Sequence, residues 1–152
     1  MLRISTLRKF YLTFVRTYAD VNQLHLTLAS PTKVFYNSKV VKQVDIPSFS
    51  GNFGVLANHV PILALLKPGV IKVFEEDGKI NDIFVSSGTV TINSDSTCQV
   101  LAEEAIPLDY IDQSACKEAL HHYQQEMSKA SEDQKAELAI GIEVLETISK
   151  LA

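Results

Sequence analysis

Residues 70–85 read VIKVFEEDGKINDIFV, two runs rich in β-branched and aromatic residues with Asp77-Gly78 between them. An Asp-Gly pair between such runs is a strong local signal for a β-hairpin, because glycine readily adopts the positive φ that a tight turn requires. This stretch therefore predicts two antiparallel strands, at residues 70–74 and 80–85.

The pattern of this hairpin continues on both sides, over residues 24–105. Apolar side chains repeat with a period of two at Leu24, Leu26 and Leu28, at Val44 and Ile46, at Val90 and Ile92, and at Cys98, Val100 and Ala102. Turn-forming pairs such as Ser30-Pro31, Pro68-Gly69 and Ser87-Gly88 punctuate the region. Alternation of this kind indicates strands with one buried face, and many short strands with frequent turns predict an antiparallel β-sandwich.

The period changes to that of a helix after Pro107. Residues 111–130 predict a first helix with Asp109 and Asp112 at its N-terminus, and Ser131 to Gln134 form a capping box for a second helix over about 133–150. The short connection makes the pair an antiparallel hairpin. The predicted fold class is therefore a β-sandwich followed by an α-helical hairpin, a segregated α+β arrangement.

The second helix is apolar over an unusually broad arc, which we interpret as a face for a partner. The residues on this arc are Leu138, Ile140, Ile142, Val144, Leu145 and Ile148. One neighbouring helix with small residues at Ala115 and Ala119 offers little area to cover it. Either the sandwich or another subunit must cover the remainder, and the sequence leaves both open.

The first 18 residues contain Arg3, Arg8, Lys9 and Arg16 and no acidic residue. A basic, hydroxylated and acid-free segment is typical of a mitochondrial transit peptide, with cleavage expected near Ala19. We therefore expect three parts: a transit peptide at 1–18, a β-sandwich domain at 19–106 and a C-terminal two-helix hairpin at 107–152.

Charge and hydropathy exclude several classes of function. No run of eighteen or more apolar residues is present, so no membrane-spanning helix is predicted. Without the four bases of the first 18 positions, ten lysines remain against all 18 acidic residues, a formal charge of −8. Nucleic-acid binding is disfavoured, because phosphate contacts need clustered Lys and Arg. The negative charge is consistent both with binding to basic protein partners and with a surface that is charged only for solubility.

No arrangement of residues predicts catalysis, a metal or a cofactor. The Gly51-Asn52-Phe53-Gly54 stretch has neither the Lys-Ser or Lys-Thr ending nor the following helix of a phosphate-binding loop. His59 has no neighbouring acid or second histidine in sequence, so we interpret it as structural, in a loop closed by Pro61. Adjacent His121 and His122 diverge on a helix. Two cysteines so far apart in sequence do not make a zinc site.

Residues 51–61 and Lys67-Pro68-Gly69, together with residues 84–88 and 101–105, resemble the delta/epsilon subunit family of ATP synthases from about Leu24 to the C-terminus. The family comprises the mitochondrial delta subunit and its counterpart, the epsilon subunit of bacteria and chloroplasts. The resemblance implies a non-catalytic central-stalk subunit. It would link the membrane ring of c subunits to the gamma shaft, and so couple proton flow to ATP synthesis.

The resemblance also implies sites, partners and a location. Gly51, Asn52, Phe53 and Gly54 match the family segment that lies against the ring, and His59 and Pro61 belong to a structural loop. The helical hairpin would pack near gamma and the small mitochondrial epsilon subunit. The protein would be peripheral to the matrix face of the mitochondrial inner membrane, without spanning it.

One departure from the family concerns nucleotide. Some bacterial relatives bind ATP through an Ile-Asp-x-x-Arg-Ala pattern, and here Ile111-Asp112 is followed by Gln113-Ser114-Ala115 without the arginine. No nucleotide binding is therefore expected.

Two other classes of function compete with the stalk interpretation. One is a free-standing mitochondrial β-sandwich binding module with a helical dimerisation hairpin, which would need an aromatic-lined pocket. The other is a small hydrolase built around His59, which should lose activity when His59 is replaced by Gln.

Overall fold

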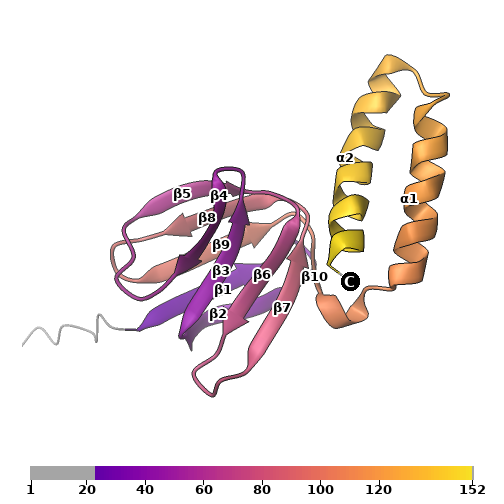
Figure 1. Cartoon of the computed structure of the whole chain (residues 1–152). Helices are drawn as coiled ribbons and strands as arrows, with labels where there is room; N and C mark the ends of the chain where they lie inside the picture. Colours follow the sequence, from indigo (N-terminus) through magenta and orange to yellow (C-terminus); the bar gives the residue numbers. More distant parts are fainter. Residues whose placement is uncertain (1–22, 152) are drawn as a thin grey trace, which may run out of the picture.

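The computed structural model describes residues 23–151, which form one ten-stranded sheet and two α-helices (Figure 1). The strands are β1 (Leu24–Ala29), β2 (Val34–Val41), β3 (Gln43–Ser48), β4 (Gly51–Val55), β5 (Ile62–Leu66), β6 (Gly69–Phe74), β7 (Ile80–Val85), β8 (Gly88–Ile92), β9 (Thr97–Ala102) and β10 (Ala105–Pro107). A short 3-10 turn, Leu108–Tyr110, leads to α1 (Gln113–Met127) and α2 (Glu132–Lys150). The expected transit peptide lies outside the described residues.

The sheet runs β10-β7-β6-β3-β5-β8-β9-β1-β2, with β4 paired to β3. It folds into two layers, because β3 and β5 share one register pair, Ser48 with Leu66, where the sheet turns the corner. The strands β10, β7, β6, β3 and β4 form one layer, and β5, β8, β9, β1 and β2 form the other. The predicted β-sandwich followed by a helical hairpin is confirmed.

The space between the layers is filled by the alternating apolar side chains that the sequence predicts. Leu24, Leu26 and Leu28 of β1 are at most 1% exposed, and Cys98 and Val100 of β9 are fully buried. They belong to one continuous core cluster that draws on both layers. Each such aliphatic side chain contributes about 1.5–3 kcal/mol through removal from water, so the period-two pattern is the main source of stability.

The predicted β6–β7 hairpin is present with the expected turn. Gly78 has φ of +87°, and the Asp77 Oδ1 accepts a hydrogen bond from the Lys79 backbone N–H at 2.9 Å. The register pairs run from Gly69 with Val85 to Phe74 with Ile80.

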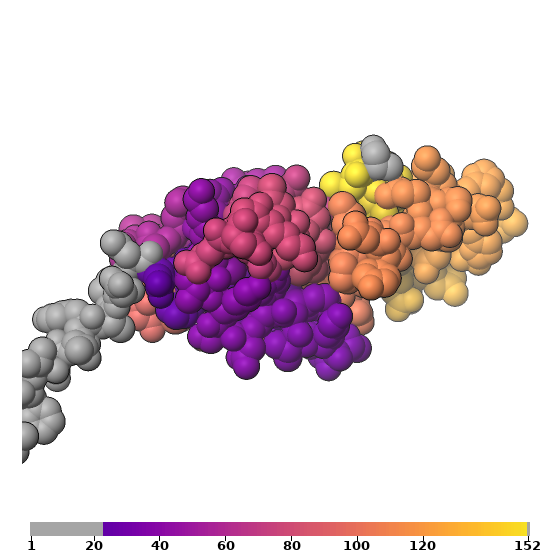
Figure 2. Space-filling view, turned by 90° about the horizontal axis from the view of Figure 1, so that it is seen from below, coloured from indigo at the N-terminus to yellow at the C-terminus, as the bar shows by residue number. Residues whose placement is uncertain are grey.

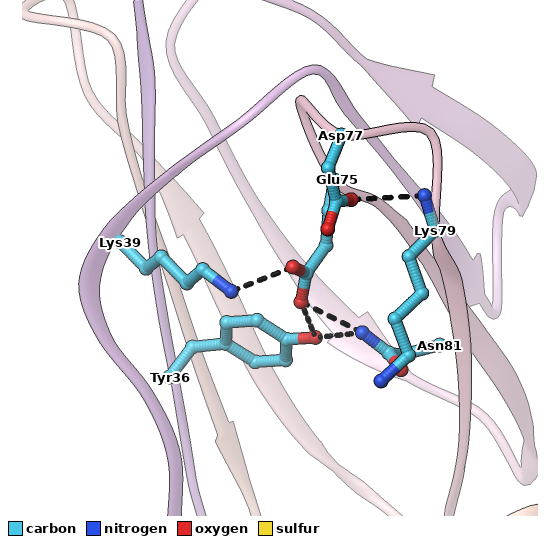
Figure 3. A network of polar contacts seen from close by, with 6 residues as sticks. All are labelled: Tyr36, Lys39, Glu75, Asp77, Lys79 and Asn81. Atoms are coloured by element: carbon cyan, nitrogen blue, oxygen red, sulfur yellow. Dashed lines mark hydrogen bonds and ion pairs between the residues drawn. The ribbon is translucent and has the colours of Figure 1, made fainter.

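A polar cluster ties β2 to this hairpin across the open side of the sandwich (Figure 3). The Tyr36 hydroxyl donates to Glu75 Oε1 at 3.0 Å, and Lys39 Nζ lies 2.7 Å from Glu75 Oε2. The Asn81 amide donates to both Glu75 Oε1 and the Tyr36 hydroxyl. We call these four residues the Glu75 cluster. It connects two parts of the sheet that share no strand pairing.

Both helices of the hairpin begin at the N-caps that the sequence predicts. Asp112 Oδ1 accepts from the backbone N–H groups of Ser114 and Ala115 at the start of α1. At α2, Gln134 Oε1 accepts from the Ser131 N–H at 3.1 Å as part of a capping box. Asp109 belongs to the preceding 3-10 turn.

The hairpin stands beside one end of the sandwich, and the molecule is elongated (Figures 1 and 2). Phe84 of β7 points away from the core, between Ile83 and Val85 that point into it, yet it is only 4% exposed. Ile148 near the end of α2 is also buried outside the core cluster, and α2 contacts the adjacent strand β6. The sandwich therefore covers the C-terminal end of α2 and leaves its N-terminal half free.

Candidate interaction surface

Residues 46–66, from β3 through β5, contain no Asp, Glu, Lys or Arg. This uncharged segment carries five large apolar residues that are 52–75% exposed: Phe49, Leu56, Val60, Leu63 and Leu65. Depletion of charge together with exposed apolar side chains is characteristic of the centre of a protein–protein interface. In Figure 1 strands β4 and β5 of this segment lie along the upper side of the sandwich.

The four residues predicted for the ring contact lie together on β4. Gly51, Asn52 and Gly54 are exposed, and Phe53 is half-buried with its ring centroid 6.3 Å from that of His59. Gly51 has φ of +122°, a conformation that favours glycine, and its carbonyl accepts the Ser48 hydroxyl at 2.6 Å. This hydrogen bond lies beside the turn that joins β3 to β4 and helps to hold it.

Gly54 has a packing role. A Cβ atom there would lie 2.9 Å from Asp45 Oδ1, which already accepts from the Gln43 side-chain amide at 2.6 Å. The missing side chain makes room for this polar pair on the outer face of β3.

His59 lies in the loop between β4 and β5. Its Nδ1 is 2.8 Å from the Val60 carbonyl oxygen, and its backbone N–H donates to the Leu56 carbonyl. The neighbouring Asn58 N–H donates to Ser96 Oγ at 2.9 Å, which fixes the loop against the β8–β9 turn. These contacts hold a loop and supply no acid–base partner for the histidine.

The outer face of the second layer is also neutral. Strands β5, β8, β9 and β1 contain no charged residue at all. The register pairs align Leu65, Thr89, Leu101, Ala29 and the neighbouring Val34 in one row across the face. Leu65, Leu101 and Val34 are each 58–60% exposed. By contrast, the other layer carries Asp45, Lys72 and Asp82 on β3, β6 and β7.

The apolar arc predicted for α2 is only partly covered. Ile148 is buried; Leu138, Ile142, Val144 and Leu145 are half-buried; Ile140 is 67% exposed. Helix α1 approaches closely at Gly141, where a Cβ would lie 2.6 Å from the Tyr123 ring. Both the sandwich and α1 therefore bury part of the apolar arc of α2, and Ile140 stays exposed to solvent.

Within residues 23–151, two buried groups have raised pKa values and no cluster of metal-binding side chains is present. No group of three or more His, Cys, Asp or Glu is placed to hold a metal. Burial raises the pKa of Cys98 to about 12, so its thiol is protonated and unreactive. Burial and the hydrogen bond to Glu75 raise the pKa of Tyr36 to about 12, whereas the hydrogen bond from Lys39 lowers the pKa of Glu75.

A cavity of about 800 Å³ lies between α1 and α2 near their connection. Most of the residues that line it are polar, and Tyr123 and His122 are its only side chains with a ring. It lacks the aromatic lining expected of a free-standing binding module. Between residues 23 and 151, no helix combines the length and the hydropathy that crossing a bilayer requires.

Comparison with known proteins gives a consistent result. The family described as ATP synthase, Delta/Epsilon chain, beta-sandwich domain matches residues 23–108. The chain is a member of the ATP synthase delta/epsilon family. The mitochondrial ATP synthase subunit delta of Caenorhabditis elegans is 42% identical over 97% of this chain and 95% of its own length. The corresponding subunit of Yarrowia lipolytica is 41% identical over 88% and 83%.

Among solved structures, a chain in the Euglena gracilis mitochondrial ATP synthase, described as OSCP/F1/c-ring in rotational state 1, has a TM-score of 0.80. Its sequence is 26% identical, and the match covers 86% of this chain and 81% of that one. The family relationship inferred from residues 51–61, 67–69, 84–88 and 101–105 is confirmed. Members of the delta/epsilon family are subunits of a larger enzyme, so the chain is a non-catalytic subunit, as predicted.

The sequence reasoning missed Phe49 and Leu101 as exposed apolar residues of this delta/epsilon family member. The absence of charge over residues 46–66 is the signal that would have found Phe49. Leu101 is harder to find, because it becomes notable only when the sheet aligns it with Leu65 and Val34.

Proposed function

We propose that the chain is a central-stalk subunit of the mitochondrial proton-translocating ATP synthase, peripheral to the matrix face of the inner membrane. It links the membrane ring of c subunits to the gamma shaft and so couples proton flow to ATP synthesis. Family membership supports the assignment to the enzyme. The observation that carries the linking role is the uncharged, apolar and exposed surface on the sandwich.

Two parts of this surface suit two different partners. The β3–β4 hairpin, with exposed Gly51, Asn52 and Gly54 and half-buried Phe53, is assigned to the ring. The broad face of β5, β8, β9 and β1, centred on Leu65 and Leu101, is assigned to gamma, because a shaft needs a wide contact to hold the subunit. The uncovered part of α2 around Ile140 is assigned to the small epsilon subunit.

Cleavage of residues 1–18 as a transit peptide belongs to the same proposal, as does a division into a sandwich domain and a hairpin domain near residue 106. Native-gel separation of gently solubilised mitochondria, followed by mass spectrometry, tests it. We expect this chain to migrate with the intact ATP synthase, with an N-terminal peptide that begins near Ala19. A free species alone, with none in the large complex, would contradict the proposal.

Depletion gives the functional test. Mitochondria that lack the chain should lose ATP synthesis driven by the proton gradient, because the ring and the shaft are no longer joined. Normal coupled synthesis after complete depletion would contradict a linking role.

A further inference from the structure

Strand β2 forms one end of the described sheet, and its pairing to the rest is irregular. Within that sheet it pairs with β1 alone, and the register shifts twice, between Leu26 and Leu28 and between Leu28 and Ala29. Ser38, inside the strand, has φ of +48°, which is uncommon for a residue other than glycine. An edge strand with such breaks in its pairing opens at a lower free energy than a strand paired on both sides.

The strand that faces β2 across the open side of the sandwich is β7. No strand pairing joins these two strands within residues 23–151. A cavity of about 410 Å³ lies between them, lined by Phe35 and Tyr36 of β2, by residues 79–83 and by residues 107–109. Contact between β2 and β7 on this side therefore depends on side chains.

The carboxylate of Glu75 provides that contact (Figure 3). It accepts a hydrogen bond from the Tyr36 hydroxyl at 3.0 Å and another from Lys39 Nζ at 2.7 Å, both from β2. The Asn81 amide of β7 donates to the same carboxylate at 2.7 Å and to the Tyr36 hydroxyl at 2.8 Å. One carboxylate thus joins donors from the two facing strands.

The turn between β6 and β7 fixes the backbone of Glu75. Its N–H donates to the Lys79 carbonyl at 2.8 Å, and its carbonyl accepts from the Gly78 N–H at 3.1 Å. The Glu75 side chain is 13% exposed, against 51% for Lys39. The carboxylate is therefore a fixed acceptor on the β6–β7 hairpin, and β2 carries two of its donors.

The charge of Glu75 determines the strength of this contact. Hydrogen bonds to an ionised acceptor are roughly twice as strong as neutral ones. An uncharged group of the same shape would still accept from Tyr36 but would lose the attraction to Lys39. Because Tyr36 is 7% exposed and belongs to the core cluster, release of its hydroxyl also loosens a residue that fills the core.

We propose that β2 is a strap across the open side of the sandwich and that the Glu75 carboxylate is its latch. With the latch closed, the two layers keep a fixed relation. With the latch broken, β2 separates from β7 and the open side widens, while the pairing of β1 with β9 retains the fold. The inference concerns the isolated chain and does not rest on the stalk role, so its failure would leave that role untouched.

Two nitroxide labels on the free chain test this proposal. Val34→Cys on β2 and Ile80→Cys on β7 place labels at positions that are 59% and 54% exposed, one on each side of the opening. The thiol of Cys98 is fully buried, and Cys116→Ala removes the other native thiol. Electron paramagnetic resonance then gives the distribution of distances between the labels.

Glu75→Gln keeps the size of the side chain and removes its charge, and Lys39→Met removes the partner charge at an exposed position. We expect both variants to widen the distribution and to shift it to longer distances, with an unchanged circular dichroism spectrum. Lys135→Met is the matched control, because its ion pair with Glu132 is 2.8 Å long and lies within α2. Equal widening in this control would overturn a specific latch, and unchanged distances in both latch variants would overturn the proposal.

Amide hydrogen exchange provides a second measurement on the same variants. In Glu75→Gln, the β2 amides that pair with β1 should exchange about tenfold faster than in the parent chain, because the strap opens locally. The amides of β9, which is paired on both sides, are the internal reference and should change less. Equal acceleration in β2 and β9 would overturn the strap, since the cluster would then support only the fold as a whole.

Discussion

At the scale of single residues, Tyr36 shows how one hydroxyl group joins separate parts of the sheet. It contacts Glu75 and Asn81, which lie 39 and 45 positions further along the chain. We predict that Tyr36→Phe lowers the free energy of unfolding by about 1–2 kcal/mol, because hydrogen bonds to charged groups are stronger than neutral ones. Urea denaturation measures the change.

Tyr110→Phe is the matched control, since Tyr110 is 81% exposed. This variant should unfold at the same urea concentration as the parent chain. A Tyr36→Phe chain that also matched the parent would show that the Glu75 cluster contributes nothing to stability.

The raised pKa values of Cys98 and Tyr36 predict that the folded chain loses stability at alkaline pH. Burial raises the pKa of Cys98 from 9.0 to about 12, and the pKa of Tyr36 rises from 10.0 to about 12. Between these values the unfolded chain ionises while the folded chain stays neutral, so the stability present below pH 9 is lost as pH rises towards 12. For Cys98 the loss is roughly 1.4 kcal/mol per pH unit.

Denaturation series from pH 8 to pH 11 check this expectation. Cys98→Ala should show a shallower decline between pH 9 and pH 10 than the parent chain, whatever its stability at pH 8. Parallel curves for the two chains would mean that the thiol does not titrate as its burial requires.

At the scale of elements, α1 and α2 are brought together by a glycine. The Tyr123 ring occupies the space where a residue at 141 would place its Cβ. Gly141→Ala gains up to about 1 kcal/mol of helix propensity but forces the ring away, and overpacking costs about 1–3 kcal/mol. We predict a net loss of stability, measured by thermal unfolding of the hairpin.

The Tyr123→Ala background separates the two effects. There the ring is absent, so Gly141→Ala should stabilise the chain through propensity alone. Destabilisation in both backgrounds would contradict the contact.

The elements themselves were largely predictable from sequence. The Asp77-Gly78 turn, the alternation in β1 and β9, and the caps at Asp112 and Ser131 are local signals, and each acts within a few residues. The Glu75 cluster and the alignment of Leu65 with Leu101 depend on which strands become neighbours, and local pattern does not encode that. The coverage of α2 was undecided for the same reason.

At the scale of the whole molecule, the neutral outer face of β5, β8, β9 and β1 should control assembly. We predict that Leu101→Lys, at a position 58% exposed, leaves folding within about 0.5 kcal/mol of the parent. The variant should nevertheless reduce incorporation into ATP synthase, because an unpaired charge in a buried interface is costly. Native-gel yield and urea denaturation of the isolated chain measure the two effects.

Ile80→Lys is the control, since Ile80 is 54% exposed but belongs to β7 in the other layer. It should assemble normally. Equal loss of assembly in both variants would point to a general effect of added lysine and contradict a specific face.

The uncharged segment also affects the fate of the folded chain before it assembles with its partners. A newly folded copy presents 21 consecutive residues without charge, five of them large, apolar and open to water. Productive assembly, self-association and proteolysis compete for such a copy, and only productive assembly buries the surface in the intended complex. We expect the amount of this subunit in the cell to follow the supply of its partners more closely than its own rate of synthesis.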